Sequence, residues 1–130
     1  MNNQANFPFL DEEVINNMKE LGNGDEAYAD RLLIVQLMSV YLENLPERVA
    51  ELTEAMKKKD APVIERSAHT LKSSSRLIGL AALAEDCQVL EDMGFDKKLE
   101  NAQPLYEKIV AATKKAVDVL KNKIIEIEKT

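Results

Sequence analysis

Residues 61–79 read APVIERSAHTLKSSSRLIG, and this stretch contains His69, the only histidine of the chain. Small and apolar residues recur in it at steps of three and four, which is the spacing of one buried face of an α-helix. These residues are Ile64, Ala68, Leu71, Ser75 and Ile78. At about 100° per residue, His69 lies roughly 140° from the centre of that face. The spacing therefore predicts a helix that buries one side and turns His69 toward solvent.

Positive charge gathers around His69 although the protein as a whole is acidic. Arg66, Lys72 and Arg76 lie within two helical turns of His69, and no Asp or Glu occurs from residue 66 to residue 84. Over the whole chain, 23 Asp and Glu outnumber 17 Lys and Arg, which gives a net charge of −6. An imidazole that is neutral at pH 7 can act as a nucleophile, and nearby cations can neutralise a phosphoryl group that it carries. Ordinary solvated helix surface would show the same charges.

Composition indicates one helical domain. The chain has 130 residues, of which 5% are aromatic, and it contains four Gly and four Pro. This mainly aliphatic mixture suits a helical bundle. The net negative charge argues against nucleic-acid binding, and no run of residues approaches the length of about 18 apolar residues that a membrane span needs. Because Cys87 is the only cysteine and the first residues do not resemble a secretory signal, we expect a cytoplasmic protein.

Helical periods and turn residues divide the chain into an arm and five helices. We expect residues 1–8 to be a flexible arm and residues 9–130 to form a single domain. The expected helices span residues 11–21, 25–58, 60–79, 80–94 and 101–130. Pro46 should bend the second of them without ending it, because the apolar period continues beyond it. The predicted fold class is all-α, an up-down four-helix bundle with an additional short N-terminal helix.

Other kinds of site fit the residues less well. Glu65 and His69 stand at i and i+4, but a metal site inside a bundle would need more than one histidine. A hydrolase is disfavoured because residues 73–75, all serine, lie on the same helix as the only base, and no Gly-x-Ser-x-Gly motif occurs. The chain also lacks a glycine-rich phosphate loop. Cys87 falls on a buried line of its helix and is interpreted as a core residue. We therefore expect no metal site and no cofactor.

The run Ala68-His69-Thr70-Leu71-Lys72-Ser73-Ser74-Ser75, followed by Gly79, closely resembles the signature of histidine phosphotransfer (HPt) domains. These domains are the relay modules of multistep two-component signalling. Their pattern is roughly Ala-His-x-Leu-Lys-Gly, then two small residues, with a Gly ten residues after the histidine. The resemblance extends over residues 9–120. One position departs from it, because Ser73 stands where the family usually has Gly; we expect docking to survive this change.

The resemblance implies roles for individual residues. His69 would accept a phosphoryl group through its outer ring nitrogen, and Lys72 would help neutralise the phosphoryl oxygens. Glu91 occupies the place on the facing helix where the family often has a polar residue that orients the imidazole, and Gln88 is a second candidate for that bond. The expected receiver-docking face comprises Arg66, Ser73, Arg76, Leu77, Leu80, Ala81 and Ala84.

The resemblance also implies the partners. They would be receiver domains of response regulators, of hybrid histidine kinases, or of both, and Mg²⁺ would belong to the receiver rather than to this chain. The protein would be a relay intermediate rather than a kinase, because 130 residues leave no room for an ATP-binding domain. The alternative is a non-catalytic helical adaptor that binds receiver or kinase domains without being phosphorylated.

Overall fold

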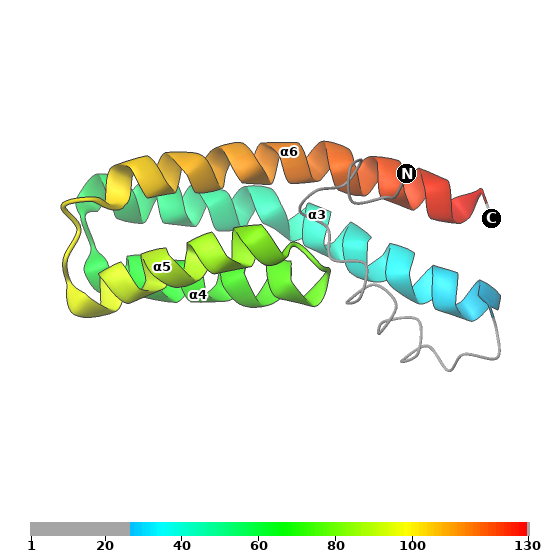
Figure 1. Ribbon diagram of the computed structural model, residues 1–130, viewed down its shortest axis with the longest axis horizontal. Coiled ribbons are helices and arrows are strands. Elements are labelled where there is room, and N and C mark those ends of the chain that lie inside the picture. The colour runs from blue at the N-terminus through cyan, green and yellow to red at the C-terminus, as the bar shows by residue number, and fades with distance from the viewer. Residues whose placement is uncertain (1–26, 130) are drawn as a thin grey trace.

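The computed structural model describes residues 27–129, which fold into four helices. The helices are α3 (Ala27–Lys58), α4 (Ala61–Leu77), α5 (Ala81–Asp96) and α6 (Ala102–Glu128). Figure 1 shows α4 and α5 lying along one side of the α3–α6 pair, with both long helices extending past them at one end. The predicted all-α, up-down four-helix bundle is confirmed. The expected first helix and the arm over residues 1–8 lie outside the described residues.

Pro46 lies inside α3, which continues for three further turns to Lys58. Proline removes one backbone donor and crowds the preceding turn, so it bends a helix whose packing continues on both sides. In Figure 1, α3 changes direction along its length. The prediction that this helix continues through Pro46 is confirmed.

The core is built from aliphatic side chains of all four helices. Its fully buried members include Met38, Leu52, Leu71, Leu83, Leu90, Ile109 and Leu120. A buried hydrogen bond crosses this core, between the hydroxyl groups of Tyr41 on α3 and Ser75 on α4, whose oxygens are 2.8 Å apart. Burial raises the pKa of Tyr41 to about 12, so this phenol stays neutral at pH 7.

No helix within residues 27–129 combines the length and apolar character that crossing a membrane requires.

Specific backbone geometry fixes both ends of α4. Asp60 caps its start, since the carboxylate accepts a hydrogen bond from the backbone N–H of Val63 at 3.4 Å. Gly79 follows its end with φ 89°, a left-handed conformation that glycine adopts without a Cβ clash. The backbone N–H of Leu80 then donates to the carbonyl of Ser75 at 2.9 Å. These two ends set which side chains of α4 face the bundle.

Gly94 was expected to end the fourth helix, but α5 continues to Asp96 and ends where Lys97 takes a left-handed φ of 59°. Gly94 instead lets two helices approach closely. A Cβ at residue 94 would lie 2.8 Å from the backbone N of Glu65 and 2.9 Å from the carbonyl O of Ala61, both on α4. The missing side chain therefore determines how near α5 lies to α4.

We expect Gly94→Ala to lower the free energy of unfolding by about 1–3 kcal/mol, because the new methyl group forces the α4 and α5 backbones apart. The higher helix propensity of Ala opposes this loss by about 1 kcal/mol. Urea denaturation measures the net change. Ala111→Gly, at an exposed position within α6, measures the propensity contribution alone. A Gly94→Ala protein as stable as the wild type would contradict the close-packing role.

Candidate functional site

His69 stands on the outer face of α4, as its helical period predicts. The opposite face is buried and includes Ile64, Ala68, Leu71 and Ser75. The His69 side chain is 57% exposed. A ring in this position is anchored by a packed helix and is still accessible to a large partner.

The carboxylate of Glu91, on α5, holds one nitrogen of the imidazole. His69 Nδ1 and Glu91 Oε2 are 3.1 Å apart. An ionised carboxylate can only accept a hydrogen bond, so the hydrogen of a neutral ring lies on Nδ1. This tautomer leaves the lone pair of Nε2 available as the nucleophile.

Lys72 holds the other oxygen of the same carboxylate. Its Nζ lies 2.8 Å from Glu91 Oε1, and the Lys72 side chain is only 11% exposed. The contact is an ion pair between the Lys72 ammonium and the Glu91 carboxylate. Lys72 also donates a hydrogen bond of 2.8 Å to Gln88 Oε1, and Gln88 Nε2 donates one of 2.9 Å to Asp92 Oδ1. The site is thus a connected chain of polar groups that crosses from α4 to α5.

The electrostatics of Glu91 follow from these contacts. Burial alone would raise the pKa of the Glu91 carboxyl group, but the close contacts with Lys72 and His69 lower it more, so the net shift is downward. Glu91 is therefore ionised at pH 7, which is the state that the Nδ1–H tautomer of His69 requires.

The structure brings together His69, Lys72 and Glu91, and the amide of Gln88 makes its hydrogen bonds to other groups of the site. Gln88 was expected as a second candidate for orienting the ring, but its amide contacts Lys72 and Asp92 instead. Asp92, the last residue of this network of polar contacts, was not predicted as part of the site. Its spacing of four residues from Gln88 on one helix is the signal that could have identified it.

Five of the seven residues expected to form the receiver-docking face are exposed, and two are buried. The exposed residues are Arg66, Ser73, Arg76, Leu77 and Ala81. Leu80 and Ala84 are fully buried, so the prediction that they contact a partner is wrong. Leu80 turns into the core at the start of α5, and Ala84 is one of the buried residues of α5.

The residues of the structure can also be examined for a metal site and for a reactive thiol. Within residues 27–129, no group of three or more His, Cys, Asp or Glu side chains could hold a metal ion. Cys87 is a free thiol in the core, where burial raises its pKa to about 12. A thiol with that pKa is not a nucleophile at pH 7, so Cys87 is a core residue as predicted.

Comparisons with known proteins agree with this geometry. Residues 36–128 match the Hpt domain family. Among solved structures, the chain is similar to histidine-containing phosphotransfer protein B (HptB) from Pseudomonas aeruginosa PAO1, with a TM-score of 0.77 and 23% sequence identity. That alignment covers 92% of this chain and 96% of the other. No curated protein gives a significant match.

The lowered pKa of Glu91 predicts how its contribution to stability depends on pH. A carboxyl group whose pKa is lower in the folded state stabilises the fold above its unfolded pKa of about 4.3, and this contribution is lost as the pH falls through the folded pKa. We therefore expect the difference in free energy of unfolding between wild type and Glu91→Gln to change between about pH 5 and pH 3, with the wild type losing more stability.

Urea denaturation at several pH values measures this difference. Glu85→Gln, which removes an exposed carboxylate from the same helix, is the control for the change in net charge. A wild-type minus Glu91→Gln difference that stays constant from pH 7 to pH 3 would show that the contacts of Glu91 do not affect its ionisation.

Proposed function

Because the chain belongs to the Hpt domain family, it is a histidine phosphotransfer protein of phosphorelays, and we propose that His69 carries the phosphoryl group. Hpt domains interact with receiver domains and histidine kinases in such relays, and they are phosphotransfer intermediates rather than kinases. The observation that carries the proposal is the exposed imidazole with Nδ1 held by Glu91 at 3.1 Å. The receiver domains of response regulators or hybrid kinases are the proposed donors and acceptors.

The proposed transfer follows from the tautomer of His69. The Nε2 lone pair attacks the phosphorus of a phospho-aspartate on a receiver domain. A P–N bond forms, the P–O bond to the aspartate breaks, and the aspartate leaves as a carboxylate. The ring gains positive charge in this step, and the Glu91 carboxylate on Nδ1–H stabilises that charge. Transfer to a second receiver is the same step in reverse.

Lys72 has two parts in the proposed mechanism. It lies one helical turn from His69, so its ammonium group can approach the oxygens of a phosphoryl group on the ring. It also neutralises Glu91, with which it forms a 2.8 Å ion pair. Arg66 and Arg76, exposed on the same helix, add positive charge at the edge of the site.

The metal of the reaction is proposed to belong to the partner. Phosphoryl transfer to or from an aspartate commonly uses Mg²⁺ bound by carboxylates and phosphoryl oxygens. We place that ion in the receiver, and we propose the cytoplasm as the compartment, because the lone Cys87 gives the chain no need of oxidising conditions.

We expect His69→Gln to abolish acid-labile, base-stable phosphoryl label after incubation with a phosphorylated receiver domain, because the amide of Gln cannot be phosphorylated in this way. Phosphorylation is measured by radiolabel or intact mass, and circular dichroism checks that the variant is folded. Equal label on wild type and His69→Gln would contradict the proposal. Absence of label from the wild type, combined with retained receiver binding, would favour the adaptor alternative.

We expect Glu91→Ala to slow phosphoryl transfer by about tenfold or more, because the ring loses both its orientation and the charge that stabilises it. Glu91→Gln should be slowed less, since its amide oxygen still accepts the Nδ1 hydrogen bond. Nitrogen NMR gives a direct readout of the tautomer, because His69 is the only histidine. A wild-type imidazole mainly in the Nε2–H form would contradict the role of Glu91.

A further inference from the structure

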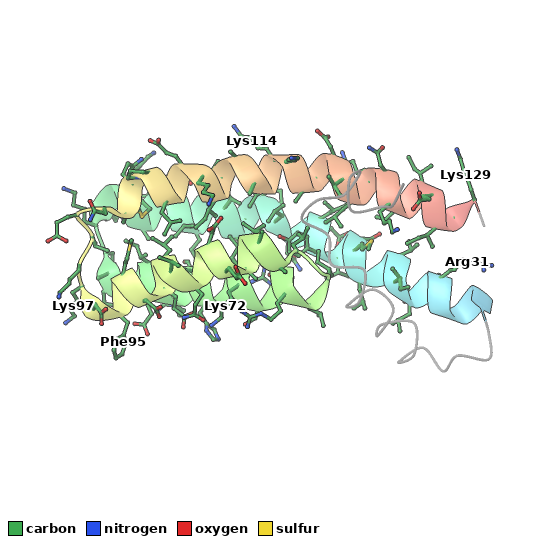
Figure 2. All side chains as sticks on the ribbon, in the orientation of Figure 1. Arg31, Lys72, Phe95, Lys97, Lys114 and Lys129 are labelled. Atoms are coloured by element: carbon green, nitrogen blue, oxygen red, sulfur yellow. The ribbon has the colours of Figure 1, made fainter. Side chains whose placement is uncertain are left out.

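Phe95, on α5, is the most exposed large apolar side chain among residues 31–129, whose side chains the structure describes. It is 69% exposed, and Figure 2 shows it projecting from the outer side of the bundle, away from the core. Covering an exposed aromatic ring with a partner surface is favourable because it removes apolar area from water, and Phe, Tyr and Trp are enriched in the buried cores of interfaces.

Phe95 lies on α5 close to the site that contains His69. Phe95 follows Glu91 by four residues, so it lies about 6 Å further along α5 and only about 40° around it. Glu91 contacts His69, and Gly94, next to Phe95, lies against Glu65 and Ala61 of α4. Phe95 therefore stands beside the line where α4 and α5 meet, one turn from the carboxylate that holds the imidazole.

The typical area of a transient interface indicates whether a receiver bound at His69 also covers Phe95. Weak and transient complexes bury less than about 1,200 Å² in total, or about 600 Å² on each partner, which corresponds to a disc of roughly 14 Å radius. A receiver domain that presents a phospho-aspartate to His69 centres such a disc on the imidazole. Because Phe95 follows Glu91 by one turn of α5, or about 6 Å, and Glu91 contacts the imidazole, helix geometry places Phe95 within a disc of that radius.

We propose that Phe95 is the apolar anchor through which this chain binds the receiver domain that phosphorylates His69. The inference rests on the proposed function of His69. Arg66 is one turn from His69 on α4, in the same direction as Phe95 on the antiparallel α5, and it is exposed. The receiver surface at this end of the site therefore offers an apolar hollow for Phe95 beside carboxylates that pair with Arg66.

The occupant is a receiver rather than a second copy of the chain. Two copies joined through Phe95 would bury the surroundings of His69 at the moment when His69 must meet a phospho-aspartate. The relay requires this face to be open between encounters, which is consistent with a single exposed anchor and a weak complex.

The test compares Phe95→Ala with wild type in two phosphorylation reactions. The first donor is the receiver domain that transfers fastest to wild-type protein among receivers of the same organism, phosphorylated with acetyl phosphate and then desalted. The second donor is phosphoramidate, a small molecule that needs no docking surface. We expect Phe95→Ala to raise KM for the receiver by about tenfold or more with kcat unchanged, and to leave the phosphoramidate reaction unchanged.

Two further variants serve as matched controls. Phe95→Leu keeps an apolar side chain at the same position and should remain within about threefold of the wild-type KM. Val89→Ala removes another exposed apolar side chain of α5, 46% exposed, which lies about 160° around the helix from Glu91. It should leave both reactions unchanged.

The outcomes separate the anchor from the proposed function. Wild-type protein that neither donor phosphorylates contradicts the role of His69. Wild-type phosphorylation with an unchanged receiver KM in Phe95→Ala overturns the anchor alone. If Phe95→Ala is also phosphorylated more slowly by phosphoramidate, Phe95 maintains the structure of the site around His69, and this result overturns its role as an anchor. A change from dimer to monomer in sedimentation, with transfer unchanged, shows that Phe95 binds a second copy instead.

Discussion

The ion pair and hydrogen bond that Glu91 makes across α4 and α5 are the contacts on which the site depends. One carboxylate binds Lys72 through one oxygen and His69 through the other, at 2.8 Å and 3.1 Å. These distances require the two helices to be close and in a fixed register. Gly94 provides the closeness, since any Cβ at that residue would meet the α4 backbone. A packing constraint inside the bundle thus sets the chemistry on its surface.

The same contacts explain why the charged carboxylate of Glu91 is half-buried at the edge of the core. Taking a lone carboxylate out of water costs several kcal/mol, and a close cation offsets much of that cost. Lys72 supplies the cation, and its own burial is offset by Glu91 and by the bond to Gln88. Since the pair is only partly exposed, it resists screening by salt better than a surface pair does. His69 consequently meets a carboxylate that is fixed in place and ionised.

The sequence predicted those features that depend on the helical period and failed at those that depend on how helices meet. The period placed His69 outside and Cys87 inside, and both are confirmed. Glu91 lies 22 residues from His69, so its place beside the imidazole followed from the resemblance to HPt domains and not from spacing. Gly94 was interpreted as a helix end because glycine serves both helix ends and close contacts, and only the neighbouring helix distinguishes the two. Ala84 was misplaced because packing between helices decides which side of α5 is covered, and Leu80 was misplaced because it precedes α5 and turns into the core.

The charge of Glu91 would be a disadvantage beside a phosphoryl group if Lys72 did not neutralise it. A phosphohistidine adds close to two negative charges at the ring, and an unpaired carboxylate in contact with the same ring would repel them. The pair of Glu91 and Lys72 presents no net charge, so the carboxylate can hold Nδ1–H without opposing the phosphoryl group on Nε2. The remaining acidity of the chain, net −6, is largely screened beyond about 8 Å at physiological salt. On the proposed function, the exposed Arg66 and Arg76 supply positive charge around the histidine that partly offsets the nearby carboxylates of Glu65 and Asp92.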